Sequence, residues 1–345
     1  MQVNSERSKV LDAFKGIGII MIVSIHILQW SQLFSEPGVL NNIRTSGLLG
    51  VEITFVINAF LFTKSYEKYV RGGYCTPWQL VAKCFRRIIP LYWLLLLVGE
   101  FIKDGITEPW WNIVLHFLCL NWLTPTLFAT GVGGSGYIAV LSLMWLLYLC
   151  ILKGMKNFGS ALTIGVVYTS IGFLMYRILF ILNGVVYQMP ISTWEPWLWY
   201  IYRGIYSYSL GGMLYFATKE GVMDKVPNGA KILCSAICSF VIIERILEVG
   251  SLQNGLIFAI LSTILIALNI NKGSKGLRVL PLIGKHSMEI FVSHILSKYI
   301  LVDFLGLFYR GRLCLLSIVL LTIALVIPLL KIGELLSALM NKLKK

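Results

Sequence analysis

Charged side chains are scarce in this chain of 345 residues. Aspartate, glutamate, lysine and arginine together make up 13% of the residues, whereas soluble domains contain roughly 25%. Hydrophobic residues make up 57%, and the mean hydropathy is +0.78. This composition excludes a protein whose surface lies mainly in water. It favours an integral membrane protein with the lipid bilayer as its principal surroundings.

Residues that bind metals or form disulfides are also few. The chain has seven cysteines and four histidines. The cysteines lie mostly within or beside apolar runs, and no C-x-x-C pair or Cys/His cluster occurs. We interpret the cysteines as packing residues. The sequence therefore predicts no metal site and no permanently bound cofactor.

Acidic residues are outnumbered by basic ones, with 16 aspartates and glutamates against 30 lysines and arginines. The resulting net charge of +14 would suit nucleic acid only if a soluble module carried a basic face. No polar segment of the sequence is long enough to fold as such a module. We expect no nucleic-acid partner, and membrane topology accounts better for the positive charge.

Apolar runs of about 20 residues, the length that crosses ~30 Å of hydrocarbon as a helix, recur along the chain. Runs such as 313–330 are apolar all round, which excludes the alternating strands of a barrel. We predict an all-α, polytopic transmembrane helix bundle that forms a single domain over residues 1–345. Its ten predicted spans are residues 10–30, 47–64, 86–103, 136–152, 160–182, 198–217, 230–247, 253–270, 287–306 and 312–331.

Lysine and arginine alternate in abundance between successive loops, as expected from the excess of basic residues in short cytoplasmic loops. With the N-terminus inside, every predicted cytoplasmic segment contains basic residues. The predicted outer segments 104–135 and 183–197 contain none, and Arg310 and Arg312 are the main exceptions. The pattern predicts that both termini are cytoplasmic.

Ionisable side chains inside the predicted spans are candidate functional residues, because each costs a few kcal/mol unless it faces a cavity or a partner. Lys15 and His26 are 11 residues apart, which is close to three helical turns and places them on one face of the first span. Asp12 lies on the same span. Glu52 is expected at a depth similar to His26 and would orient its imidazole, or else face water at the interface. Other polar residues at depth, any of which could form a structural pair, are Asn58, Arg177, Arg203, Glu289, His294 and Lys298.

Five motifs follow one another along the chain in an order found in a known family. They are V-L-D-A-F-K-G-I-G-I-I-M-I-V-S-I-H from Val10, G-V-E-I-T-F-V-I-N-A-F-L from Gly50, K-C-F-R-R-I-I-P-L-Y from Lys83, Y-S-L-G-G at 208–212 and I-G-K-H-S-M-E-I-F-V-S-H at 283–294. In these motifs the chain resembles the acyltransferase-3 family of membrane carbohydrate O-acyltransferases, and the resemblance covers nearly the whole chain.

Four residues in the first three motifs differ from the family pattern. Lys15 stands where the family usually has arginine, which keeps the charge but loses bidentate hydrogen bonding. Asn58 and Ala59 replace a Ser-Gly pair. Cys84 occupies the first arginine position of an Arg-x-x-Arg motif, although Lys83 and Arg86 flank it.

The resemblance implies that an acyl group, expected to be acetyl, passes from acyl-coenzyme A as co-substrate to a hydroxyl. The acceptor would be a sugar of a cell-surface polysaccharide or its lipid-linked precursor, and the location a bacterial cytoplasmic membrane. His26 would act as general base or accept the acyl group itself, with Glu52 as its partner. The expected substrate-binding residues are Asp12, Lys15, Asn58, Lys83, Arg86, Arg87 and His294.

Other functions remain open from the residues alone. Lys83, Arg86 and Arg87 also fit ordinary positive-inside anchoring, and an isolated buried histidine such as His294 more often has a structural role. Buried charges on several helices also mark the substrate pathway of a transporter or flippase for a lipid-linked saccharide. A non-catalytic membrane scaffold is the third alternative.

Overall fold

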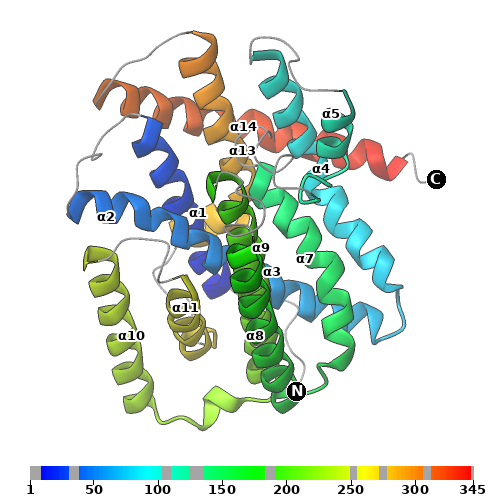
Figure 1. Cartoon of the computed structure of the whole chain (residues 1–345), viewed down its shortest axis with the longest axis vertical. Coiled ribbons are helices and arrows are strands. Elements are labelled where there is room, and N and C mark those ends of the chain that lie inside the picture. The colour runs from blue at the N-terminus through cyan, green and yellow to red at the C-terminus, as the bar shows by residue number, and fades with distance from the viewer. Residues whose placement is uncertain are drawn as a thin grey trace.

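The computed structural model describes residues 9–30, 39–102, 110–123, 135–182, 191–248, 255–271, 278–305 and 312–342 (Figure 1). Of these residues 91% are helical, and no strand occurs among them. The predicted all-α class is therefore confirmed for the described part of the chain.

The helices follow the apolar runs of the sequence, and the described residues of each predicted span lie on helical structure. Two short π-helical segments, η2 and η5, continue α3 and α13. The elements are α1 (Lys9–Trp30), α2 (Val39–Ser46), η1 (Gly47–Leu49), α3 (Gly50–Ser65), η2 (Tyr66–Val70), α4 (Pro77–Ile102), α5 (Trp110–Phe117), α7 (Ser135–Gly154), α8 (Phe158–Leu182), α9 (Ile191–Lys219), η4 (Val222–Lys225), α10 (Asn228–Glu248), α11 (Gly255–Asn269), α12 (Val279–Lys285), α13 (Ser287–Lys298), η5 (Tyr299–Phe304) and α14 (Arg312–Lys342).

Five helices in the described part of the chain are long and apolar enough to cross a membrane. They cover residues 9–30, 41–70, 136–154, 158–178 and 312–336. The apolar helix at 255–269 is shorter. Several other predicted spans lie on helices with charged residues near one end, such as Lys83, Arg86 and Arg87 in α4. The structure thus supports a membrane protein, while ten spans and cytoplasmic termini stay predictions.

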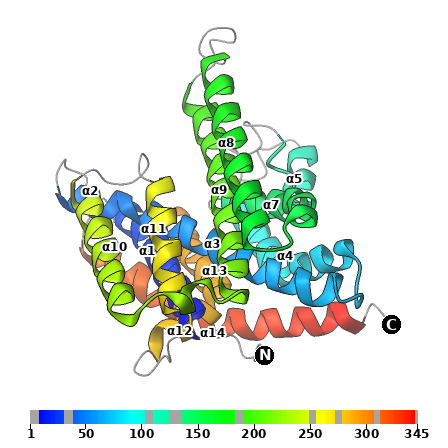
Figure 2. The same cartoon turned by 90° about the horizontal axis from the view of Figure 1, so that it is seen from below.

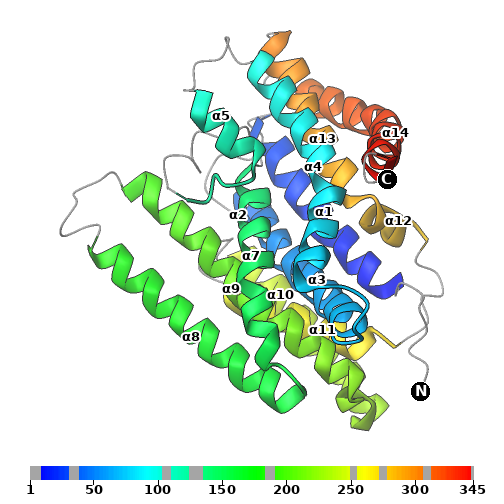
Figure 3. The ribbon, with the colours of Figure 1, turned by 90° about the vertical axis from the view of Figure 1, so that its right-hand side faces the viewer.

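Helices α1, α3 and α4 lie between α8 on one side and α14 on the other (Figure 3). Helices α8 and α9 pack side by side and extend together beyond their neighbours (Figure 2). Helix α8 turns a row of apolar side chains outward, as expected for a helix in contact with hydrocarbon. This row contains Leu162, Val166, Ile171, Leu174 and Ile178.

Helix α1 contacts two neighbours through glycine, without side chains between the backbones. A Cβ atom on Gly16 or Gly284 would collide with the backbone of the opposite helix, so α1 and α12 touch directly at these residues. Gly18 of α1 and Gly50 of α3 make the same kind of contact. Small residues allow such close approach between membrane helices. These contacts fix the position of α1, which carries three of the predicted site residues.

Candidate active site

His26 of α1 and His294 of α13 lie against each other in the interior. Their ring centroids are 5.5 Å apart and the rings are inclined by 25°. Trp30, one turn after His26, stacks at 5.5 Å on His26 and at 5.6 Å on His294. Within the described chain, neither ring nitrogen of the fully buried His294 has a hydrogen-bond partner of good geometry. His294 makes only weak hydrogen bonds, to the backbone of Phe291 and Ile290 one turn earlier in α13.

Glu52 of α3 pairs with α9 instead of with His26. Arg203 donates from Nε to Oε1 at 2.6 Å and from Nη2 to Oε2 at 2.8 Å, and the Tyr206 hydroxyl donates to Oε1 at 2.8 Å. All three side chains are buried. No hydrogen bond joins Glu52 to His26, both of which are described. The expectation that Glu52 orients the His26 imidazole is therefore corrected. The expected depth of a carboxylate in the bilayer does not tell which neighbouring helix it faces.

A cavity of about 230 Å³ lies between α1, α3, α4, α7 and α13. The exposed Lys83 and Arg87 of α4 line it, as does the buried Lys15 of α1. On α3 its lining extends from Thr54 to Ser65, a distance of about 16 Å at 1.5 Å per residue. The exposed cations mark its mouth, and the buried lining residues mark its inner end.

The inner wall carries a chain of hydrogen bonds that the sequence did not reveal. Asn58 Nδ2 donates to the Tyr137 hydroxyl at 3.3 Å, and this hydroxyl donates to Thr54 Oγ1 at 3.3 Å. The Tyr137 ring stacks on Phe55 at 5.0 Å. All three polar residues line the cavity. Thr54 and Asn58 are four residues apart, a spacing that puts both on one helix face and is the one sequence signal for this wall.

Phe291 of α13 connects the cavity with the histidine pair. It lines the cavity, and its ring centroid is 5.4 Å from that of Tyr137 and 5.3 Å from that of His294. Because Phe291 and His294 are three residues apart, both rings emerge on the same side of α13. Neither histidine is among the lining residues, so the Phe291 ring separates the inner end of the cavity from His294, which in turn lies against His26.

The cavity brings together four of the predicted substrate-binding residues, namely Lys15, Asn58, Lys83 and Arg87. Arg86 is not among the lining residues, and its Nε donates to the Ala82 carbonyl of the same helix at 3.3 Å. Asp12 is buried where α1 meets Gly284 of α12, outside the cavity lining. Lys83 and Arg87 are one turn apart on α4, and Lys15 and Asn58 come from the facing helices α1 and α3. Arg86 projects from another side of α4.

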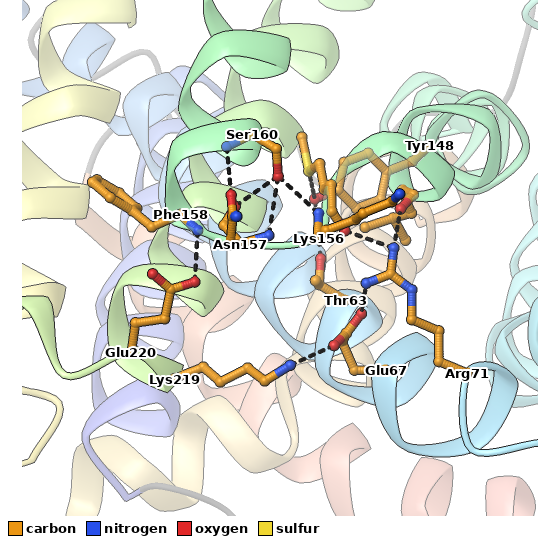
Figure 4. A network of polar contacts seen from close by, with 12 residues as sticks. Thr63, Glu67, Arg71, Tyr148, Lys156, Asn157, Phe158, Ser160, Lys219 and Glu220 are labelled. Carbon is orange, nitrogen blue, oxygen red and sulfur yellow. Dashed lines mark hydrogen bonds and ion pairs between the residues drawn. The ribbon is translucent and has the colours of Figure 1, made fainter.

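A polar network joins the ends of several helices (Figure 4). Arg71 Nη2 donates to the carbonyls of Leu152 at 2.9 Å and Met155 at 2.6 Å, at the end of α7. Glu67 accepts from Arg71 and, at 2.7 Å, from Lys219 of α9. The network joins the segment after α3 to α7 and α9. It holds α3 and α7, which form two walls of the cavity, at a fixed separation.

The comparison with known families gives one match. The model of the acyltransferase-3 family, described as an acyltransferase domain, matches residues 9–331. No curated protein and no solved structure matches the chain. The matched range begins with α1 and ends inside α14, so it includes the histidine pair and every residue of the cavity. The chain therefore belongs to the acyltransferase-3 family and is a membrane acyltransferase.

Proposed function

We propose that the protein transfers an acetyl group from acetyl-coenzyme A to a hydroxyl of a cell-surface polysaccharide or of its lipid-linked precursor. In this proposal the protein is a multi-pass protein of the bacterial cytoplasmic membrane, with the cavity mouth on the cytoplasmic side. The observation that carries the proposal is the cavity, which has exposed cations at its mouth and the histidine pair beyond its inner end.

The charge of the cavity suits coenzyme A. Its phosphates are anionic, and both Lys83 and Arg87 are placed at the mouth to bind them. None of the lining residues is acidic, so nothing there repels a phosphate. Lys15 adds a third positive charge deeper in the cavity.

The shape of the cavity suits the pantetheine arm. The lining residues on α3 extend over about 16 Å, and apolar side chains such as Ile19, Leu141 and Trp145 line much of the wall. A slender arm of moderate polarity fits such a passage. The amide group of Asn58 and the Tyr137 hydroxyl supply polar groups near the inner end, where the arm carries its thioester.

The transfer itself is assigned to His26. The acceptor oxygen attacks the thioester carbonyl carbon while His26 takes the hydroxyl proton. The carbon–sulfur bond then breaks, an ester forms, and coenzyme A leaves as a thiol after receiving the proton from His26. His26 is half-buried, whereas His294 is fully buried. His26 is thus the histidine that an acceptor can reach, and His294 is a positioning residue.

The test is binding of acetyl-coenzyme A to detergent-purified protein. We expect a Lys83→Ala, Arg87→Ala double variant to lose most of the affinity, because it lacks both cations of the mouth. Arg86→Ala is the control, since it removes one positive charge from the same helix outside the cavity lining, and the single variants Lys83→Ala and Arg87→Ala, which each remove one charge inside it, are compared with it. The proposal fails if folded native protein does not bind acetyl-coenzyme A, or if the double variant binds it as tightly as the control does.

A further inference from the structure

The inner end of the cavity is closed by aromatic rings. Phe291 is 3% exposed, and its ring lies between the cavity and His294, in contact with both. Tyr137 contacts Phe291 from the opposite wall at 5.4 Å. These two rings bound the space in which the tip of any molecule threaded through the cavity must fit.

The Tyr137 ring, on one side of the closed end, is held in place. The Tyr137 hydroxyl is held by Asn58 and Thr54, and its ring is stacked on the fully buried Phe55. Moving the ring would break two hydrogen bonds and the stacking contact. Since protein interiors are close-packed, extra atoms at this point have no free volume to enter. The length of the molecule that the cavity accepts thus depends on the opposite ring, that of Phe291.

The acyl group is the outermost part of an acyl-coenzyme A arm, so it meets the closed end first. We propose that Phe291 limits the length of the transferred acyl group: its ring leaves room for an acetyl group and excludes acyl chains longer by several methylenes. This inference rests on the proposed function and adds a specificity-determining residue to it. A single methylene in a tight apolar site changes discrimination by about 10- to 200-fold.

The experiment compares dissociation constants of acetyl-, butyryl- and hexanoyl-coenzyme A for purified native protein and for Phe291→Ala. Binding is measured because it requires no acceptor. We expect native protein to favour acetyl- over hexanoyl-coenzyme A, and Phe291→Ala to reduce this preference by about tenfold or more. Each preference is the ratio of two dissociation constants measured on the same protein sample, so differences between samples in the fraction of active protein cancel.

Phe62→Ala is the matched control. Phe62 has the same side chain, the same 3% exposure and a place in the same cavity lining. Its ring packs on Tyr148 at 6.2 Å and is not part of the contact with His294. Because Phe62 lines the cavity, its loss should weaken the binding of all three donors alike, and the ratio of their dissociation constants should stay native.

Three results would overturn the inference: equal binding of all three donors by native protein, an unchanged preference in Phe291→Ala, or an equal loss of preference in Phe62→Ala. If Phe291→Ala does not fold, Phe291→Leu decides by the same ratio, because it shortens the ring side chain while keeping an apolar group. Native protein that binds none of the three donors would instead refute the proposed function, and this inference with it.

Discussion

His26 and His294 stack on each other at 5.5 Å although they come from α1 and α13, which are more than 250 residues apart in the sequence. Such a contact requires α1 and α13 to pack directly, and both histidines occupy predicted spans where an unpaired polar ring is costly. Apolar packing alone therefore does not explain why the two histidines lie here. Two predictions follow from the roles that we assign to them.

Replacing His26 should remove the general base and leave the donor site intact. We expect His26→Ala to lower acyl transfer by about 10²- to 10⁴-fold, while acetyl-coenzyme A binds as it does to native protein. Transfer is measured as radiolabel passed from acetyl-coenzyme A to the cell-envelope fraction of membranes that contain the protein. Full transfer by the variant would exclude His26 from the reaction.

His294→Phe separates function from packing, because it keeps an aromatic ring beside His26 and Trp30 but removes two buried nitrogens that have no hydrogen-bond partner of good geometry. Burying a polar group without a hydrogen bond costs about 1–3 kcal/mol. We expect a higher unfolding temperature together with slower transfer, and an unchanged KM for the donor. A variant that is more stable and fully active would show that His294 has only a structural role.

Glu52 should be needed for stability. Glu52→Gln leaves the guanidinium of Arg203 buried without its counter-charge, which typically costs about 3–5 kcal/mol. We expect Glu52→Gln to have a clearly lower unfolding temperature in detergent. The double variant Glu52→Leu, Arg203→Met lacks both charges and should recover part of this loss. If Glu52→Gln were as stable as native protein but inactive in transfer, the carboxylate would take part in the reaction. This is the role that its expected depth in the membrane first indicated.

The glycine contact between α1 and α12 gives a further test. A Cβ on Gly284 collides with the Asp12 carbonyl, so Gly284→Ala should destabilise the protein by about 1–3 kcal/mol, as overpacking does. Gly229→Ala is the control, because a Cβ there meets nothing within 4 Å. Thermal unfolding of the two variants is compared with native protein. Equal unfolding temperatures for all three would contradict the contact.

Much of the fold could be predicted because hydrophobic length and periodicity are local properties. The expected spans 10–30 and 136–152 nearly coincide with α1 and α7. The span expected at 86–103 belongs to a helix that begins at Pro77, since the preceding turns are amphipathic and give no long apolar run. Hydropathy marks the part of a helix that suits hydrocarbon, and not where the helix begins.

The site was predictable where charge or family motif marked a residue, as with Lys15, Lys83 and Arg87, which line one cavity. It was not predictable where the decisive property is a contact between distant segments. Glu52 was assigned to His26 because no sequence signal identifies Arg203 as its neighbour. Tyr137 and Phe291 were missed since a single aromatic residue in an apolar span is usually part of the packing.

Helix α1 is in backbone contact with α12 at Gly16 and with α3 at Gly18. With no side chains between the backbones at these points, α1 cannot slide along either neighbour without a collision. Lys15 and His26 lie on this one helix, so the rise between them is about 16 Å at 1.5 Å per residue, and the glycine contacts fix both residues relative to α3 and α12. A donor whose anionic end is held near Lys15 must carry its thioester on an arm of matching reach. Short thioesters that lack the pantetheine arm should therefore be poor donors, however reactive their acyl group is.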